Sequence, residues 1–553
     1  MLGMTTNDRK HGTRRGARIL IGAIVGVIAA GSGLALGELA AAVTGPATSP
    51  VLSVGSAAID LAPTPVKEFA IRTFGTADKL VLISGVLAVL VVLSALGGIL
   101  VRTRFATGAA IFISFGVLGV LAAVTRASAQ PTDSMPSALA GVAALGVLYL
   151  LVRVWRKGEE PAMAEGVAPG DVTPADTPDA APDSVAGTTE GTTERGTPSR
   201  RGLLIASAAS VAVAAVAATA GRLLQAVRRD VAESRAAVRL PKPADPAPEL
   251  PAGYRTKVSG ISPYFTPNKD FYRVDTVLSL PSVPAEEWTL RIGGDVKRPI
   301  ELSFRDLLDR GLTERDLTLS CVSNEVGGPY VGTARWLGIP LGDLLREAGV
   351  SSSSDQLLSR SEDGMTIGTP MEGVLDGRDA LLAVGMNGEP LPVNHGFPAR
   401  MIVPGFYGYT SATKWVVELT ATRFDEVQAY WTQRDWDPRG VVKTASRIDV
   451  PRPFERVSQG EITVAGVAWA QHRGISAVQV RMDGGPWQDA ELSTQVSADT
   501  WRQWRTTFSA RPGTRRFEVR AADGNGDPQT EKRTRPFPDG ASGWHSVAVT
   551  VTP

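Results

Sequence analysis

The sequence predicts an all-α transmembrane region, then an α+β domain, then a C-terminal β-sandwich. Three observations support this prediction. Long apolar runs are confined to the first part of the chain, before about residue 230. A segment rich in Pro, Thr, Ala, Asp and Glu interrupts them at 158–199. After residue 250 the apolar residues recur in short alternating segments separated by Gly and Pro, a pattern typical of short strands and helices.

The composition excludes several classes of protein. The 553 residues include 57 basic and 56 acidic side chains, which gives a formal charge of +1. Nucleic-acid-binding domains normally show a strong basic excess, so no nucleic-acid partner is expected. The single cysteine, Cys321, excludes an intrachain disulfide, a CxxC redox pair and a zinc site built from several thiolates.

Five apolar runs predict five transmembrane helices. An α-helix needs about 20 apolar residues to cross a bilayer. Buried core helices are the alternative, but such helices rarely lack charge on every face. The runs are 19–43, 80–101, 105–125, 137–152 (long enough with its flanks) and 203–221. The first four make a membrane region at 1–157, and the fifth lies in a segment at 200–228.

Basic side chains flank these runs in a pattern that predicts the orientation. Cytoplasmic loops of membrane proteins carry the excess of Lys and Arg, so the N-terminus is expected inside. Five crossings then place the chain after about residue 228 outside the cytoplasm, in a multi-pass protein of the cell membrane. The flanking residues are Arg9, Lys10, Arg14, Arg15, Arg18, Arg102, Arg104, Arg153, Arg156, Lys157, Arg200 and Arg201.

Two segments without long apolar runs adjoin the fifth run. Residues 158–199 hold almost no large apolar residue to bury, which predicts a disordered acidic linker. The linker ends in Ser199-Arg200-Arg201-Gly202, which resembles a twin-arginine export signal placed inside the chain. An ordinary basic flank explains the two arginines equally well. Residues 229–250 are Pro-rich and predict an extended tether.

Short alternating elements predict the α+β domain over 251–450. Residues 288–292 and 317–321 alternate as strands, and the second ends at the cysteine. Ser303 caps a predicted short helix with Asp306 in its first turn, and 339–345 opens another.

Beyond residue 450 the pattern is that of strands alone. About seven short strands in roughly 100 residues, separated by Gly-rich turns, predict an immunoglobulin-like β-sandwich over 451–553. No cysteine is present there for the usual inter-sheet disulfide.

Cys321 is the first residue that points to chemistry. A lone cysteine is most often a small buried apolar side chain. Here it ends a predicted strand before the polar, Gly-rich segment 322–328, where a thiolate can face a cleft. A nucleophilic cysteine would need a base, for which His395 is the nearest candidate. A thiolate also binds a transition metal directly, so both roles stay open from the residues alone.

Several sequence blocks occur in a characteristic order around and after the cysteine. The segment Thr318-Leu319-Ser320-Cys321-Val322-Ser323-Asn324 comes first. The later blocks are 387–400 (NGEPLPVNHGFPAR), 402–405 (IVPG), 408–415 (GYTSATKW) and 430–436 (YWTQRDW). Together they resemble the sulfite oxidase family of molybdopterin enzymes over about residues 250–553. The resemblance implies a molybdopterin-binding oxidoreductase domain at 251–450 and a dimerisation domain at 451–553, and hence a possible homodimer.

The same resemblance implies a Mo-molybdopterin cofactor whose molybdenum is bound by Cys321. A guanidinium gives the bidentate, permanently charged contact that a phosphate favours, and the family's phosphate contact falls on Arg400. Without the resemblance, His395 would be interpreted as a loop histidine, Arg400 and Lys414 as solvated charges, and Phe271 and Tyr272 as core aromatics. The implied cofactor contacts are Asn268, Phe271, Tyr272, Cys321, His395, Arg400, Ser411, Thr413 and Lys414.

The implied activity is two-electron oxygen-atom transfer to or from a small molecule. Tyr330, Arg335 and Tyr409 are expected to act with Cys321 at the catalytic pocket, and Tyr407 to line it. Family members that oxidise sulfite place an arginine pair shortly after the metal-binding cysteine. Here 323–328 contains no arginine and one acid, Glu325. A reductase of S- or N-oxides is therefore the alternative within the enzyme class.

Two further expectations concern partners and class. The apolar runs contain no histidine, which excludes a bis-histidine haem within them and implies a separate electron-transfer partner. The alternative from a different class is a non-enzymatic cell-surface protein, with the sandwich as an adhesion module. Molybdenum content distinguishes the two.

Overall fold

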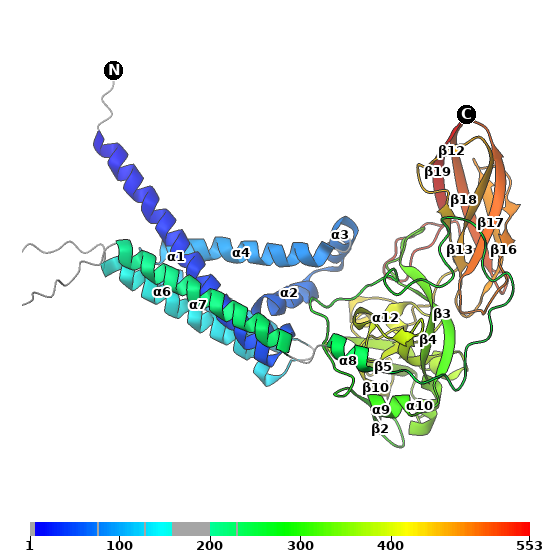
Figure 1. Cartoon of the computed structure of the whole chain (residues 1–553), viewed down its shortest axis with the longest axis horizontal. Coiled ribbons are helices and arrows are strands. Elements are labelled where there is room, and N and C mark those ends of the chain that lie inside the picture. Colours follow the sequence, from blue (N-terminus) through cyan, green and yellow to red (C-terminus); the bar gives the residue numbers. More distant parts are fainter. Residues whose placement is uncertain (1–5, 75–76, 127–128, 158–199, 228–230) are drawn as a thin grey trace, which may run out of the picture. The chain divides into compact units, whose positions relative to one another are not determined.

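The computed structural model describes the chain except for residues 1–5, 75–76, 127–128, 158–199 and 228–230. The chain divides into two compact units, Met1–Gln225 and Ala226–Pro553, which are described one at a time (Figure 1). The linker predicted at 158–199 lies outside the described residues.

The described part of the first unit consists of helices. Four stretches are long and apolar enough to cross a membrane: Gly16–Thr44, Asp78–Leu100, Phe105–Val124 and Pro131–Arg156. They correspond to the first four predicted spans. The helices are α1 (Thr6–Thr44), α2 (Pro50–Leu61), α3 (Thr64–Phe74), α4 (Asp78–Leu100), α5 (Phe105–Val124), α6 (Met135–Lys157) and α7 (Arg200–Val227), with the turns η1 (Pro46–Thr48) and η3 (Pro131–Ser134).

Small residues let these helices approach one another closely. A Cβ added at Gly26 of α1 would lie 2.0 Å from the carbonyl oxygen of Ser94 in α4. One added at Gly98 of α4 would lie 2.1 Å from the carbonyl oxygen of Gly22 in α1. Helices in lipid associate through backbone contact of this kind.

The basic flanks of α1, α4 and α6 lie at one end of the unit. Arg156 in α6 donates to the carbonyl of Val101, directly after α4, at 3.1 Å. The same end of α4 meets the start of α1 through Gly98 and Gly22. The structure therefore places positively charged segments that are far apart in the sequence at the same end of the helical unit.

Helix α7 packs beside this group, yet its apolar part is shorter than the other four. The Ser32 hydroxyl of α1 donates to the carbonyl of Ser210 in α7 at 3.5 Å, and a Cβ added at Gly202 would lie 3.8 Å from Val154 of α6. The apolar stretch of α7 is Leu204–Ala220. The fifth crossing therefore stays a prediction.

The second unit begins with two sheets that share a core. One sheet has the order β2-β1-β10-β5-β6, with β1 parallel to β10. The other has the order β3-β4-β7-β8, with β9 paired to β7. Their strands are β1 (Thr289–Gly294), β2 (Ile300–Ser303), β3 (Thr313–Ser320), β4 (Val331–Pro340), β5 (Gln356–Ser361), β6 (Thr366–Pro370), β7 (Leu381–Met386), β8 (Glu389–Pro390), β9 (Arg400–Ile402) and β10 (Val416–Thr422). The helices and turns are α8 (Val231–Ala237), α9 (Phe304–Leu308), α10 (Leu341–Ala348), α11 (Glu372–Leu375), α12 (Gly408–Ser411), η4 (Val393–His395) and η5 (Thr432–Arg434).

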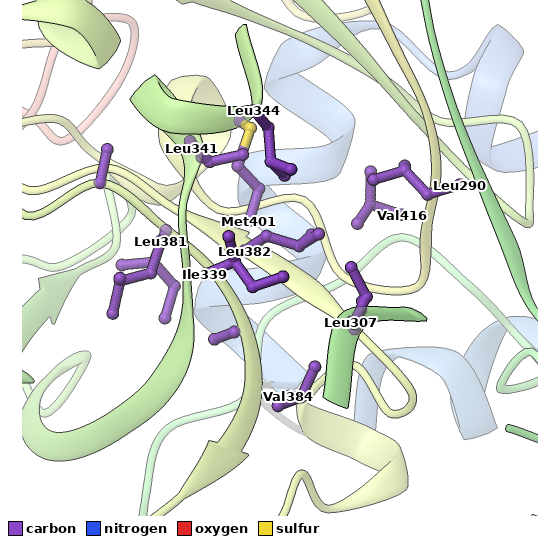
Figure 2. Close-up of a cluster of buried hydrophobic side chains, with 14 of the residues drawn as sticks. Leu290, Leu307, Ile339, Leu341, Leu344, Leu381, Leu382, Val384, Met401 and Val416 are labelled. Atoms are coloured by element: carbon purple, nitrogen blue, oxygen red, sulfur yellow. The ribbon is translucent and has the colours of Figure 1, made fainter. Parts of the chain in front are cut away.

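The core between these elements draws side chains from both sheets and from α9 and α10. The predicted cap of α9 is present: the Ser303 hydroxyl accepts from the Asp306 amide at 3.2 Å, and the Asp306 carboxylate accepts from the Ser303 amide at 2.8 Å. Figure 2 shows the buried residues Leu290, Leu307, Ile339, Leu341, Leu344, Leu381, Leu382, Val384, Met401 and Val416.

The C-terminal part is a two-sheet β-sandwich with its own core, in agreement with the predicted fold class. The sheet orders are β11-β13-β17-β16 and β12-β19-β18-β14-β15. Its buried core includes Val464, Trp504, Phe517 and Val549. The strands are β11 (Ala445–Val450), β12 (Arg456–Ser458), β13 (Gly460–Trp469), β14 (Ile475–Met482), β15 (Gln488–Asp489), β16 (Glu491–Leu492), β17 (Arg502–Ala510), β18 (Gly513–Asp523) and β19 (His545–Thr552).

The Pro-rich segment predicted as a tether at 229–250 is packed on the second unit. Arg235 of α8 donates to the carbonyl of Leu391 at 2.8 Å. The Ala244 amide donates to the carbonyl of Leu312 at 2.8 Å, and Asp245 pairs with Arg315. The prediction of a tether was wrong for the described part, because these backbone and charged groups hold the segment in place.

Candidate active site

Cys321 directly follows β3, in the connection to β4. Its amide donates to the carbonyl of Tyr330 at 2.9 Å, and its Sγ lies 2.8 Å from the hydroxyl oxygen of Ser323. The side chain is buried, with 9% exposed. Burial raises the pKa of the thiol, while Ser323 and the charge of Lys414 lower it. A bound metal ion would favour the thiolate in such a place.

The loop after Cys321 is held by residues of the sandwich. Arg447 donates from Nη1 to the carbonyl of Gly328 at 2.8 Å. Gly327 has a positive φ of 83°, and a Cβ there would lie 2.2 Å from Cδ2 of His545. The loop geometry beside the cysteine therefore depends on residues more than a hundred positions later in the chain.

Arg400 is a buried cation with unsatisfied donors. Its Nη1 donates to the carbonyl of His395 at 3.0 Å and its Nη2 to that of Ala412 at 3.4 Å. Its Nε has no hydrogen-bond partner, and among the described residues no carboxylate forms an ion pair with it. Burial lowers its pKa to about 10. A buried unpaired charge is costly, so this site fits an anionic group such as a phosphate.

Lys414 is a second, largely buried cation close to Arg400, with 12% of its side chain exposed. Its Nζ lies 2.8 Å from Asp275 and 3.4 Å from the carbonyl oxygen of Asn394. Burial lowers the pKa of Lys414 to about 8, although Asp275 raises it. Gly396, at φ 113°, brings the two cations together: a Cβ there would lie 3.0 Å from the Cβ of Arg400 and 3.1 Å from that of Lys414.

His395 is held as a neutral side chain between these groups and Phe271. Its Nε2 lies 3.1 Å from the carbonyl oxygen of Asn268, so this nitrogen carries the proton. Burial and the nearby Arg400 lower its pKa to about 4. Its ring meets that of Phe271 edge-on, at 5.7 Å between centroids.

Tyr272 connects the cysteine with the buried cations. Its ring stacks on Phe271 at 5.3 Å and lies 6.3 Å from that of Tyr330. Burial raises the pKa of its hydroxyl, the charge of Cys321 raises it further, and Arg400 lowers it. The structure therefore places Tyr272 near both the predicted metal ligand and the predicted phosphate ligand.

Three of the predicted cofactor donors bond to protein atoms. Their hydrogen bonds support the backbone around Arg400, and their contact with a cofactor stays a prediction. Asn268 Nδ2 donates to the Met386 carbonyl at 3.2 Å, Ser411 donates to the Tyr407 carbonyl at 3.0 Å, and Thr413 shares a 2.6 Å bond with Ser359.

Arg335 is not brought to the cysteine. Arg335 on β4 lies opposite Asp316 on β3. Asp316 comes four positions before Ser320, the last residue of β3, and four positions along a strand span about 13 Å. The Arg335 guanidinium forms a bidentate pair with Asp316, at 2.7 and 2.9 Å. A role for Arg335 at the pocket stays a prediction; in the structure its charge is paired with Asp316.

Tyr407 and Tyr409 belong to or pack against the buried cluster that includes Val322, directly after the cysteine. Burial raises the pKa of Tyr407 to about 12, and Cys321 contributes to the rise. Tyr409 of α12 donates its hydroxyl to the carbonyl of Asp437 at 2.7 Å. Burial raises its pKa as well.

A small pocket adjoins Tyr407 and the cysteine loop. Glu325 is the only carboxylate among its lining residues. The sandwich side of the pocket was missed by the sequence analysis, since no local pattern links it to the cysteine. The lining residues are Ser320, Asn324, Glu325, Val326, Gly327, Tyr407, Thr444, Ala445, Ser446, Trp469, Gln529, Ala541, Ser542 and Gly543.

The described residues contain no group of three or more His, Cys, Asp and Glu side chains able to hold a metal ion. A metal at Cys321 would therefore need ligands from outside the protein. A thiol beside buried cations is suited to an anionic organic cofactor that carries its own metal ligands.

This part of the chain is similar to several known proteins. A family described as oxidoreductase molybdopterin binding domain matches residues 277–431. Mitochondrial sulfite oxidase of Homo sapiens is 29% identical over 342 residues, covering 52% of this chain and 62% of the human protein. Sulfite oxidase of Gallus gallus is 30% identical over 299 residues, covering 45% and 64%. An NADH nitrate reductase of Spinacia oleracea is 28% identical over 317 residues, covering 46% and 34%.

Among solved structures, the sulfane dehydrogenase SoxCD of Paracoccus pantotrophus aligns with 52% of this chain and 84% of that chain, at 24% identity and a TM-score of 0.46. The chain spans less than two thirds of the length of the curated relatives described above. The matched residues 277–431 include Cys321, His395, Arg400 and Lys414.

Proposed function

Because residues 277–431 belong to the oxidoreductase molybdopterin-binding domain family, we propose that the chain holds Mo-molybdopterin through Cys321 and performs two-electron oxygen-atom transfer on a small molecule. The observation that carries the proposal is the buried Cys321 thiol near Tyr272, which is in turn near the buried Arg400, with the charge of Lys414 also acting on the thiol.

The roles of the residues follow from their surroundings. When bound, the cofactor supplies a two-electron redox centre, and the protein orients it and selects what approaches. Cys321 would give the metal a thiolate ligand. Arg400 would use its unpartnered Nε donor on the anionic end of the cofactor. His395 stays neutral and fixed by its bond to Asn268.

Metal analysis of the purified full-length protein tests this proposal. We expect stoichiometric molybdenum and an extractable pterin. In Cys321→Ser we expect the molybdenum X-ray absorption spectrum to lose one sulfur neighbour and activity to disappear, with the circular dichroism spectrum unchanged. A folded wild-type protein without molybdenum or pterin would instead favour the non-enzymatic adhesion protein.

We propose further that the unit after residue 226 lies outside the cytoplasm. Supporting this are the basic residues at one end of the helical unit and the packing of α7 beside α1. Alkaline phosphatase fused after Pro553 should be active, whereas the same enzyme fused at Arg104 should be inactive. The reverse pattern would reject this orientation. A homodimer through the sandwich stays a prediction that light scattering in detergent can test.

One observation favours an S- or N-oxide reductase over a sulfite-oxidising enzyme. Glu325 lines the pocket next to the cysteine loop, and no arginine is among the lining residues. A negative charge about 4 Å from a carboxylate costs about 1 kcal/mol in bulk water and about 4 kcal/mol near a protein surface. Neutral substrates avoid this cost. With reduced viologen as donor we expect reduction of dimethyl sulfoxide or trimethylamine N-oxide; activity towards sulfite alone would contradict this choice.

A further inference from the structure

A continuous series of four aromatic rings begins at Tyr409, which packs against the buried cluster that includes the pocket residue Tyr407. The ring of Tyr409 meets that of Trp436 edge-on at 5.0 Å between centroids. Trp436 stacks on Trp431 at 4.0 Å, with an interplanar angle of 23°. Trp431 meets Tyr430 at 4.9 Å. Each ring is therefore in contact with the next.

The inner end of the series adjoins the candidate active site. Tyr409 lies near Tyr407, close enough for charge on one hydroxyl to raise the pKa of the other. Tyr407 lines the pocket next to the cysteine loop. Tyr407 and Trp436 belong to the same buried cluster as Val322, which directly follows Cys321.

The outer end of the series reaches the surface. Tyr430 and Trp431 are half-buried, and residues 425–428 before them are exposed. The Arg434 guanidinium lies over the Tyr430 ring at 3.6 Å, and 39% of Val427 is exposed. Trp, Tyr and Arg are the residues that most often dominate the binding energy of protein interfaces.

The proposed oxygen-atom transfer needs a route for electrons. Oxidation of a substrate leaves two electrons on the cofactor, and they must pass to an acceptor. The apolar stretches of the helices contain no histidine, so a bis-histidine haem within them is excluded. Electron transfer weakens steeply across gaps in a protein, so closely packed rings are a favourable medium for it.

We propose that Tyr409, Trp436, Trp431 and Tyr430 form the electron route, and that the surface at Tyr430, Trp431 and Arg434 is where a separate one-electron carrier protein docks. The inference rests on the proposed function. Each carrier molecule accepts one electron, so two are reduced for each substrate oxidised, and the rings are bridges that are not consumed. For a reductase, the same route runs from a donor protein to the cofactor.

The chain offers a matched control for Trp431. Trp487 in the sandwich is also a half-buried tryptophan with an aromatic neighbour, Trp544, at 5.0 Å. Arg481 and Arg520 lie over its ring, at 4.6 and 4.3 Å. A loss that comes only from removing a surface tryptophan would therefore appear equally in Trp431→Leu and Trp487→Leu.

The test follows reoxidation of the reduced full-length protein by stopped flow. The protein is reduced with titanium(III) citrate, freed of reductant and mixed with ferricytochrome c or with ferricyanide, a small inorganic oxidant that needs no protein docking surface. For Trp431→Leu we expect reoxidation by cytochrome c to slow at least tenfold, or about 1.4 kcal/mol in the barrier. Reoxidation by ferricyanide should stay unchanged. Trp431→Phe, which keeps a ring, should recover most of the rate, and Trp487→Leu should match wild type.

A second readout does not depend on the cofactor. Calorimetric titration of ferricytochrome c into cofactor-free protein should show weaker binding by Trp431→Leu than by Trp487→Leu. Three outcomes would overturn the inference. Trp431→Leu and Trp487→Leu could bind and reduce cytochrome c equally well, or Trp431→Leu could be slowed equally with both oxidants. The third outcome is a wild-type protein that reduces ferricyanide but not cytochrome c. Molybdenum content is measured first, so a protein without molybdenum counts against the proposed function and not against the route.

Discussion

Arg335 and Arg400 show that the surroundings of a residue decide its role. Both are arginines of strands in the same sheet, β4 and β9, and both were expected at the active site. Arg335 is neutralised by a bidentate pair with Asp316, whereas Arg400 is buried with carbonyl partners and an unpartnered Nε. Only Arg400 has donors left for a ligand, so the two substitutions should have different effects.

We expect Arg400→Met to weaken cofactor retention, because a hydrogen bond to a charged group contributes about 1.5–3 kcal/mol, roughly a ten- to hundredfold change in affinity. Arg335→Met should retain the cofactor but lose about 3 kcal/mol of stability, since Asp316 is left buried without its partner. Pterin content after dialysis and thermal unfolding measure the two effects. Cofactor loss from Arg335→Met with a stable fold would show that Arg335 acts at the site after all.

Sequence reasoning found the site residues that lie close together in ordered blocks. His395, Arg400 and Lys414 all fall within 20 positions, where a characteristic order is visible. It did not find Asp275, which pairs with Lys414 across 139 positions, nor that Asp316 holds Arg335. Such partners are set by strand pairing and loop packing, which leave no local pattern.

At the scale of elements, the cysteine loop depends on the sandwich through His545. The His545 ring lies under Gly327, and its Nδ1 accepts from the Ile448 amide at 3.0 Å. Burial and the charge of Arg447 lower its pKa from 6.5 to about 4. The folded protein therefore holds His545 neutral at a pH at which the unfolded chain binds a proton.

This shift predicts how stability depends on pH. The unfolded state takes up a proton as the pH falls through about 6.5, so stability falls between about pH 6.5 and pH 4, by about 2 kcal/mol at pH 5 for this residue. The thermal midpoint of His545→Gln should fall less between pH 7 and pH 5 than that of wild type. Identical pH dependence of the two proteins would contradict the assignment.

The sequence predicted local features of the elements better than their long-range packing. The cap of α9 depends on Ser303 and Asp306, three residues apart, and was predicted correctly. The packing of the Pro-rich segment was not, because Arg235 bonds to carbonyls more than 150 positions away. Helix α7 lies between these cases: its helix was predicted, but its apolar length leaves the crossing open.

At the scale of the whole molecule, the second unit is compact even though it contains more than one hydrophobic core. Residues 226–553 form one compact unit although the sandwich has its own core. Strand β3, which leads to Cys321, is tied to the sandwich through Thr318. The Thr318 amide donates to the Asp499 carbonyl at 2.9 Å, and the Thr318 hydroxyl accepts from the Trp501 amide at 2.8 Å. Gln471 donates to the Thr318 carbonyl at 3.2 Å.

These bonds predict where the chain can be divided. A protein of residues 231–553 should fold without the helical unit and retain pterin, because its cores and the site residues all lie within it. A protein of residues 231–450 should unfold cooperatively at lower temperature or not fold, since it exposes the apolar face that contacts the sandwich and leaves the Thr318 groups without partners. Calorimetry and pterin content compare the two fragments with the full chain. If residues 231–450 alone retained pterin as tightly as 231–553, the sandwich would have no part in shaping the cysteine loop.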